Sequence, residues 1–200
     1  MKVYGLTGGI ASGKNAVAQI FENWGAGTID ADQLARIVVE PGKESYREIL
    51  DYFGTMVLSP DGTLDRAALR KVVFDDEAKR KRLEAIVHPR IQEVADLMIA
   101  DFRRLDKKCC IYHAALLVET GAYKDFDGLI VIKAELEQQI KRLMERDGIT
   151  HLQAEKICAS QAPLEEKLEV ADFVIDNSGS LKETVRQVRE LCHYLDVNCD

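Results

Sequence analysis

The stretch Gly8-Gly9-Ile10-Ala11-Ser12-Gly13-Lys14 has the Walker A spacing, G-x-x-x-x-G-K. The apolar residues 3–6 precede it and predict a strand, and a helical pattern from Lys14 to Trp24 follows it. In this context the backbone N–H groups of the loop and the N-terminus of the helix bind phosphate. We therefore predict a loop that wraps the phosphates of ATP, with Lys14 reaching the β- and γ-phosphates.

A dinucleotide-binding turn would need G-x-G-x-x-G, which the glycines at 8, 9 and 13 do not match. A glycine-rich turn without a ligand is the plain alternative, and the flanking strand and helix argue against it. Asn15 stands where Ser or Thr usually ligates Mg²⁺. An amide oxygen can also ligate a hard cation, so we expect Mg²⁺ with ATP as co-substrate, bound weakly or in a shifted position. The expected ATP-binding residues of this loop are Gly8, Gly9, Ala11, Ser12, Gly13, Lys14, Asn15 and Ala16.

The composition excludes several other classes of protein. The chain has 200 residues, 46% hydrophobic and 30% charged, the ordinary balance of a globular protein. A formal net charge of −7 argues against nucleic acid as a partner, because such binding needs a basic face. The chain shows no signal peptide and no apolar run near the ~20 residues that span a bilayer. We expect a cytoplasmic protein without a membrane partner, and the cysteines and histidines show no disulfide or metal pattern.

Short apolar runs alternate with helical patterns along the chain. This alternation indicates parallel strands buried on both faces, and therefore an α/β doubly wound fold. We predict a three-layer P-loop NTPase with a five-stranded parallel sheet. The expected strands are residues 3–6, 27–30, 109–112, 128–132 and 173–175.

Almost no strand signal occurs between residues 38 and 104, so we expect a helical lobe inserted in the core. Ile91, Val94, Met98, Phe102 and Leu105 share one helical face. Pro89 suits the first turn of that helix, which we predict over 89–105. In a kinase such a lobe would hold the acceptor substrate. The predicted domains are a nucleotide-binding core at 1–37 and 105–200, the substrate lobe at 38–104, and a second helical insertion at 136–169 within the core.

Asp30-Ala31-Asp32 follows the second expected strand, at the edge of the sheet where ligands bind. Carboxylates there could hold Mg²⁺ through water or orient an attacking hydroxyl. The alternative is a helix N-cap, in which Asp accepts backbone N–H bonds. Asp30 suits either role equally, and Asp32 is the better candidate for a base.

Six motifs in this order resemble the dephospho-CoA kinase family, and the resemblance covers residues 2 to 191. The Walker A motif alone would not identify the family, whereas the ordered set is specific. The motifs are G-L-T-G-G-I-A-S-G-K at 5–14, I-D-A-D-Q-L-A-R-I-V-V-E-P-G at 29–42, L-D-R-A-A-L-R at 64–70, H-P-R at 88–90, A-L-L-V-E-T-G at 115–121 and A-D-F-V-I-D-N-S-G at 171–179.

The resemblance implies that ATP phosphorylates the 3′-hydroxyl of dephospho-CoA, the final step of coenzyme A synthesis. It implies that Lys14 clamps the phosphates, that Asp32 is the general base, and that 136–169 is a lid. Arg142 and Arg146 would be catalytic lid arginines, and Asn177 would lie near the adenine of ATP. Asp32 would also contact the metal through water. The implied substrate-binding residues are Asp30, Asp32, Arg36, His88, Arg90 and Glu119.

The chain departs from the family pattern at Asn15-Ala16, at Ala11 in place of a glycine, and at His113-Ala114-Ala115. We expect alanine to tolerate the backbone conformation at position 11.

Three other functions stay open: another small P-loop kinase for nucleosides or nucleotides, a nucleotide-binding homologue of low activity because of Asn15, and a GTPase. Two stretches, 51–54 and 125–128, match the D-x-x-G motif of GTPases, but such short matches arise by chance and no N-K-x-D guanine signature occurs. We expect a monomer or a weak homo-oligomer.

Overall fold

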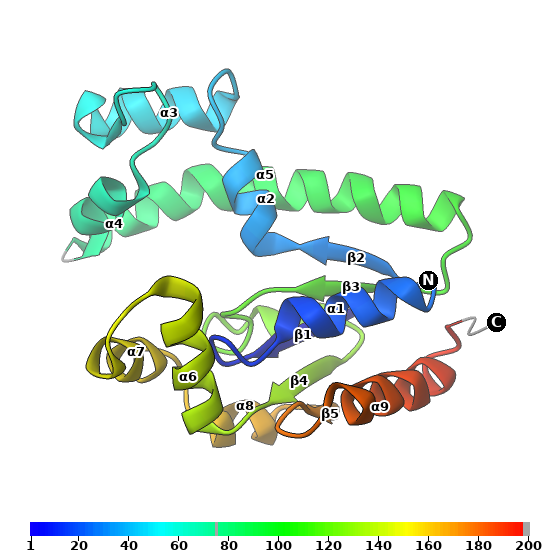
Figure 1. Ribbon diagram of the computed structural model, residues 1–200. Coiled ribbons are helices and arrows are strands. Elements are labelled where there is room, and N and C mark those ends of the chain that lie inside the picture. The colour runs from blue at the N-terminus through cyan, green and yellow to red at the C-terminus, as the bar shows by residue number, and fades with distance from the viewer. Residues whose placement is uncertain (75, 198–200) are drawn as a thin grey trace. The chain divides into compact units, whose positions relative to one another are not determined.

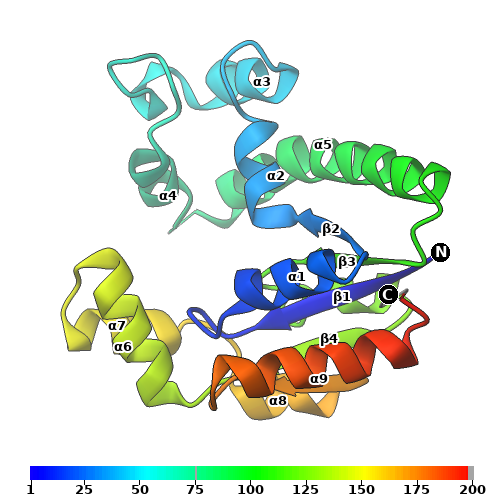
Figure 2. The same ribbon diagram turned by 45° about the vertical axis from the view of Figure 1, so that its right-hand side comes forward.

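The computed structural model describes residues 1–74 and 76–197, and its sheet confirms the predicted α/β class. All five strands are parallel, in the order β2-β3-β1-β4-β5 (Figure 1), and Figure 2 gives a second view of the sheet. They form at the places that the sequence predicts. Their bounds are β1 Lys2–Gly8, β2 Gly27–Asp30, β3 Cys109–His113, β4 Leu129–Lys133 and β5 Phe173–Asp176.

Side chains on alternate positions of β4 enter two different cores. Ile130 and Ile132 pack in a cluster with Val17, Phe21 and other residues of the helices α1 and α9. Leu129 and Val131 pack on the other face, against a cluster that includes side chains of α8. Since strand residues alternate between the faces of a sheet, a strand with four successive apolar residues, such as β4 at 129–132, must be covered on both faces. The result is the expected three-layer arrangement of helix, sheet and helix.

The chain divides into two compact units, one of residues 1–30 and 99–200 and one of residues 31–98. The first contains the sheet, and the second is helical. The short helices η1 (Thr55–Val57) and η2 (Ala122–Asp125) belong to the second and the first unit respectively. The α-helices are α1 Lys14–Asn23, α2 Ala31–Ile37, α3 Glu44–Phe53, α4 Arg66–Phe74, α5 Glu77–Arg104, α6 Leu136–Asp147, α7 His151–Cys158, α8 Leu164–Glu169 and α9 Leu181–Tyr194.

The helix predicted over 89–105 is wrong in its start, because α5 begins at Glu77 and contains Pro89 in its interior. A proline there removes one backbone hydrogen bond and usually costs about 3 kcal/mol or more. Here Ile86 and Val87 before the proline and Ile91 and Val94 after it pack in one apolar cluster with α3 and α4. Packing on both sides of Pro89 therefore keeps the helix continuous where local preference favours a break.

The predicted face of this helix is also wrong at its end. Leu105 lies beyond α5 and is 70% exposed. Phe102 does pack: a side chain at Gly27 would meet the Phe102 ring at 2.5 Å. A glycine at the start of β2 thus leaves room for the aromatic ring of α5.

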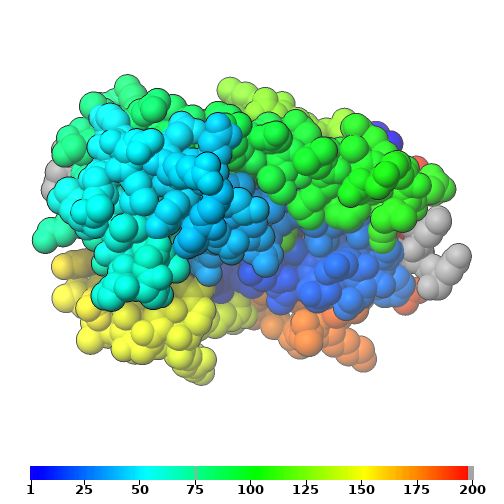
Figure 3. Space-filling model, turned by 90° about the horizontal axis from the view of Figure 1, so that it is seen from above, coloured from blue at the N-terminus to red at the C-terminus, as the bar shows by residue number. Residues whose placement is uncertain are grey.

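Two helices of the second unit are joined by ion pairs around Arg90. Its guanidinium contacts Glu44 at 2.6 Å and Glu48 at 3.7 Å, and it also contacts Glu93 on its own helix at 3.5 Å. Figure 3 shows the side chains of α3 (cyan) and α5 (green) next to each other on one face. The Arg90 side chain is 34% exposed, so we expect each pair to contribute little to stability.

Strand β3 begins with Cys109 and Cys110, both fully buried. Burial, followed by the neighbouring Cys109, raises the pKa of the Cys110 thiol to about 12.

Among the helices of the described residues, none has both the length and the apolar character that a membrane span requires.

Candidate functional site

The residues after β1 form a tight loop whose backbone is partly left-handed. Ala11 has φ 57° and Gly13 has φ 96°. The Ser12 N–H donates to the Gly9 carbonyl at 3.1 Å, and the Val17 N–H donates to the Gly13 carbonyl at 3.0 Å to begin α1. The loop therefore leads directly into the N-terminus of a helix, where an anion is stabilised.

Ala11 adopts the left-handed conformation, but at a cost. For an L-residue this region is disfavoured by about 1–2 kcal/mol. Its carbonyl accepts a hydrogen bond from Arg142 Nη1 at 3.4 Å, which helps to hold the strained residue. Alanine is thus tolerated at position 11 because the surrounding structure compensates for it.

Two side chains from distant segments hold the outer carbonyls of the loop. Asn177 Nδ2 donates to the Ser12 carbonyl at 2.7 Å, and Arg142 Nη1 approaches the same oxygen at 3.5 Å. Arg142 Nη2 also donates to the Asn177 carbonyl at 3.2 Å. The Ser12 carbonyl and the Gly13 N–H share one trans peptide and point in opposite directions. Holding the carbonyl therefore turns the Gly13 N–H to the other side of the chain, away from Asn177.

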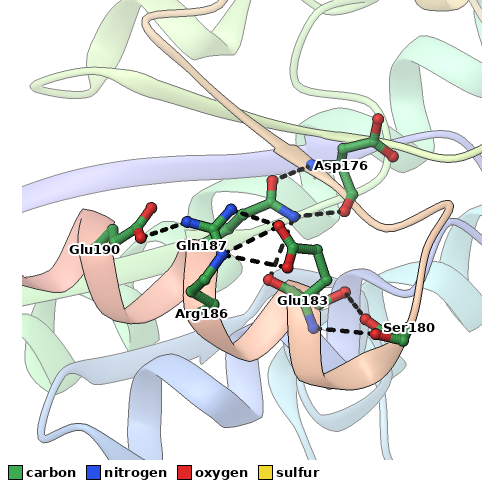
Figure 4. Close-up of polar contacts among 7 residues, drawn as sticks. Asp176, Ser180, Glu183, Arg186, Gln187 and Glu190 are labelled. Carbon is green, nitrogen blue, oxygen red and sulfur yellow. Dashed lines mark hydrogen bonds and ion pairs between the residues drawn. The ribbon is translucent and has the colours of Figure 1, made fainter.

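Helix α9 fixes Asn177 through the end of β5. Figure 4 shows Gln187 bridging the backbone of Asp176, with its Oε1 accepting from the Asp176 N–H at 2.8 Å and its Nε2 donating to the Asp176 carbonyl at 2.9 Å. Thr184 Oγ1 donates to Asn177 Oδ1 at 2.8 Å. Both ends of the Asn177 amide are thus engaged within the protein, and its contact with adenine stays a prediction.

The first turns of α9 are held by polar side chains at the surface. Ser180 caps the helix by accepting from the Glu183 N–H at 3.3 Å. Arg186 pairs with Glu183 and with Glu190 (Figure 4), and these bonds, first of all that with Glu183, raise its pKa. The group is exposed, so its main effect is to order the helix that carries Thr184 and Gln187.

Lys14 and Asn15 open α1. The Lys14 ammonium lies 3.5 Å from Asn15 Oδ1, and Asn15 is exposed at the start of the helix. In this structure the carboxamide oxygen of Asn15 therefore faces the ammonium group of Lys14. An oxygen donor of this kind fits Mg²⁺, which prefers oxygen ligands.

The two predicted lid arginines have different surroundings, although both lie on α6. Arg142 contacts the phosphate loop, as described above. Arg146 forms a two-bond pair with its neighbour Asp147 at 2.7 and 2.9 Å, which raises the Arg146 pKa and lowers that of Asp147. Only Arg142 is brought to the loop in this structure.

The carboxyl ends of the parallel strands meet at one edge of the sheet, and the predicted site residue Asp30 lies there. Asp30 is the register partner of His113, and Lys133 pairs with Asp176 at 3.2 Å. The backbone N–H of Ser178, and then Lys133, lower the pKa of Asp176. Strand β3 stays regular through His113, so the departure from the family pattern at 113–115 leaves this edge intact.

Glu119, a predicted substrate ligand, is bound inside the first unit. Its carboxylate pairs with Lys167 of α8, whose side chain is 1% exposed, and accepts from the Ala162 N–H at 3.1 Å. Gln161, next to Ala162, accepts from the Ile10 N–H of the phosphate loop at 2.6 Å. Sequence reasoning missed Gln161 and Lys167, because neither belongs to a motif with a known chemical role. The available signal was weak: Lys167 lies between Leu164 and Leu168 in a short helix, and both leucines pack in a core.

A pocket of about 630 Å³ opens beside Gly9 and Gln161, between α6, α7 and α8. A second hollow, of about 750 Å³, lies along α9 next to Trp24. No residue of the phosphate loop lines that hollow, so the pocket beside Gly9 is the one that belongs to the candidate site. Ala134 and Glu135, at the start of the α6 segment, complete its wall on the strand side.

The remaining candidates lie in the second unit. Asp32 is in the first turn of α2 and Arg36 in its last turn. Burial, and next the guanidinium of Arg36, lower the pKa of Arg66 at the start of α4. Within residues 1–74 and 76–197, neither of these arginines pairs with a carboxylate. His88 is exposed on α5, and Arg90 is engaged by the three glutamates named above.

Comparison with known proteins gives a consistent result. The family model described as CoaE, dephospho-CoA kinase, matches residues 2–183. The chain is 47% identical over 191 residues to the dephospho-CoA kinase of Geobacter sulfurreducens, covering 96% of this chain and 97% of that protein. It is 39% identical over 187 residues to the dephospho-CoA kinase of Corynebacterium glutamicum, covering 94% of each.

Solved structures are similar over the same length. The crystal structure of TT1252 from Thermus thermophilus has a TM-score of 0.84 and 31% identity, covering 96% of both chains. The dephospho-CoA kinase from Campylobacter jejuni has a TM-score of 0.69 and 28% identity, also covering 96% of both. A shikimate kinase from Bacteroides thetaiotaomicron, with a TM-score of 0.53 and 13% identity over 98% of each chain, shares the fold alone.

Proposed function

Because the chain belongs to the dephospho-CoA kinase family, we propose that its phosphate loop and Asp32 perform the family's reaction. The chain is a phosphotransferase that moves the γ-phosphoryl group of ATP to the 3′-hydroxyl of dephospho-CoA. The observation that carries the site assignment is the loop at 8–14, which enters a helix N-terminus and whose carbonyls are held outward by Arg142 and Asn177. Family membership favours this acceptor over nucleosides and over a GTPase reaction.

The residues of the first unit bind ATP. Backbone N–H groups of the loop surround the phosphates, and Lys14 neutralises the charge that develops during transfer. Arg142 lies beside the carbonyls of Ala11 and Ser12, and its positive charge stabilises the phosphates bound by the loop. Arg146 joins it when the helices of residues 136–169 close, which excludes water and prevents hydrolysis of ATP.

The second unit binds the acceptor. Arg36 and Arg66 place two positive charges close together without a carboxylate between them among the described residues. A pair of guanidinium groups in that situation is suited to bind the pyrophosphate of dephospho-CoA. His88 and Arg90 on α5 provide further polar contacts, and Asp30 contributes from the end of β2. Asp32 then accepts the proton of the 3′-hydroxyl as the hydroxyl oxygen attacks the γ-phosphorus in line, and ADP leaves from the opposite side.

Asn15 and, through water, Asp32 would hold Mg²⁺ with the nucleotide. Bound there, the ion supplies positive charge to the β- and γ-phosphate oxygens. Both residues offer the oxygen donors that this cation prefers. Asn15 contributes a neutral oxygen on a longer side chain than serine, which weakens this ligand.

The function is tested with a panel of acceptors and labelled ATP. Dephospho-CoA should be phosphorylated at its 3′-hydroxyl, whereas adenosine, which lacks the pyrophosphate, should have a much lower kcat/KM. Shikimate and gluconate should give no transfer. Faster transfer to adenosine than to dephospho-CoA would contradict both the acceptor and the role of the arginine pair.

We expect Asn15→Ser to lower the Mg²⁺ concentration required for half-maximal turnover. A serine hydroxyl is the usual Mg²⁺ ligand at this position. In the natural chain Lys14 competes with Mg²⁺ for the Asn15 oxygen, and the substitution removes this competition. Initial rates measured across a Mg²⁺ series, at saturating ATP and dephospho-CoA, check this. An unchanged Mg²⁺ dependence would show that Asn15 is not a ligand, and Asn23→Ser at the far end of α1 is the matched control.

A further inference from the structure

The connection between α7 and α8 contacts the phosphate loop directly. Gln161 Oε1 accepts the hydrogen bond of the Ile10 N–H at 2.6 Å, across 151 positions of sequence. Ile10 lies in the middle of the Walker A stretch, and Gln161 is half-buried in the wall of the pocket beside Gly9. This contact comes from a side chain outside every motif of the sequence.

The bond determines the orientation of a peptide in the loop. The Ile10 N–H and the Gly9 carbonyl belong to one trans peptide and point in opposite directions. With the N–H directed to Gln161, the Gly9 carbonyl faces the Ser12 N–H and accepts its hydrogen bond at 3.1 Å. The Gln161 contact thus supports the turn that brings Ser12 and Gly13 into place.

Gln161 is itself held by a buried ion pair. The N–H of the next residue, Ala162, donates to Glu119 Oε1 at 3.1 Å, and the same oxygen pairs with Lys167. The Lys167 side chain is 1% exposed and that of Glu119 is 20% exposed. Burying an ammonium is costly unless it is paired, and an apolar residue could fill the same space. The pair therefore serves to fix the position of residues 161–162 more than to increase stability.

We propose that Gln161 is a positioning residue for nucleotide binding, held in place by the Glu119–Lys167 pair. It complements Arg142 and Asn177: they hold carbonyls of the loop, and Gln161 holds an N–H. This inference rests on the proposed function, since it concerns how the same loop binds ATP. Gln161 acts through the backbone of the loop, so its removal should affect nucleotide affinity more than the chemical step.

The test is Gln161→Met, which keeps the length of the side chain and removes the acceptor. One hydrogen bond is worth about 0.5–1.5 kcal/mol, so the Kd for MgADP by calorimetry should rise about threefold to tenfold. The KM for ATP should rise in parallel, with the KM for dephospho-CoA and the kcat within about twofold of the natural chain. In the nucleotide-free protein, the Ile10 amide should exchange its hydrogen faster.

Two further variants separate positioning from a general structural effect. Gln161→Glu keeps an acceptor oxygen, so the Ile10 amide should stay as protected from exchange as in the natural chain. Among the described residues the Ser160 hydroxyl bonds only to the Ile157 carbonyl, at 2.7 Å, so Ser160→Ala should leave ADP binding unchanged. Unchanged ADP affinity and Ile10 exchange in Gln161→Met would overturn the proposal. Because ADP binding needs no acceptor, this result is independent of whether dephospho-CoA is phosphorylated.

Discussion

The Asp32→Asn protein should bind ATP like the natural chain and transfer its phosphate about 10²–10⁴-fold more slowly, the usual range for loss of a general base. An amide has nearly the same shape as a carboxylate but does not accept the proton of the 3′-hydroxyl. Asparagine keeps an oxygen for the proposed water-mediated contact with Mg²⁺, and the other proposed phosphate contacts come from residues 8–16, so the KM for ATP should change little. Steady-state rates at saturating dephospho-CoA measure the effect on kcat.

The matched control is Asp51→Asn, an exposed carboxylate on α3 in the same unit. It makes the same change of charge and should keep the natural turnover within about twofold, since exposed charges contribute little to stability. A fall in kcat of less than about tenfold in Asp32→Asn would show that another group accepts the proton.

Gly13→Ala should both destabilise the protein and prevent tight binding of ATP. Gly13 has φ +96°, and an added Cβ would lie 2.2 Å from Asn177 Nδ2. Asn177 would have to leave the Ser12 carbonyl that it now holds. The left-handed conformation costs about 1–2 kcal/mol and overpacking costs about 1–3 kcal/mol. Together they should lower the thermal midpoint by roughly 5–15 °C in a chain of this size.

Gly148→Ala is the control for this substitution. Gly148 ends α6 with φ +66°, and an added Cβ would meet nothing within 4 Å. Gly148→Ala should be destabilised only by the left-handed backbone, so its thermal midpoint should fall less than that of Gly13→Ala. Its ADP affinity should stay within about threefold of the natural value. Equal loss of ADP affinity in both variants would show that the contact with Asn177 is unimportant.

Sequence patterns predict the sheet well because each strand is a short apolar run between helices. The start of helix α5 is where the sequence prediction is wrong, and the reason is instructive. Pro89 locally favours a helix start, and only the cluster that packs Ile86 and Ile91 on either side of it keeps α5 continuous. Information of that kind is tertiary, so no local pattern contains it.

In the candidate site, too, some residues can be recognised from the sequence and others cannot. The glycines and Lys14 are recognisable because phosphate binding demands their spacing. The groups that hold the loop come from positions 142, 161 and 177, and act through single side-chain bonds to its backbone. No spacing rule applies to such bonds, because any segment that folds near the loop can supply them. The motif is therefore visible in the sequence. Of its supporting residues, the family resemblance names Arg142 and Asn177 but gives them other roles, and it leaves Gln161 out.

Burial of the cysteines in β3 has a consequence for an enzyme whose substrate ends in a thiol. Thiol–disulfide exchange proceeds through the thiolate, and oxidised forms of the substrate can attach to accessible cysteines as mixed disulfides. With a pKa of about 12 and no exposed surface, Cys110 has almost no thiolate near neutral pH, and Cys109 beside it is equally shielded. The central sheet can therefore contain two adjacent thiols and still resist S-thiolation by the molecule that the enzyme handles.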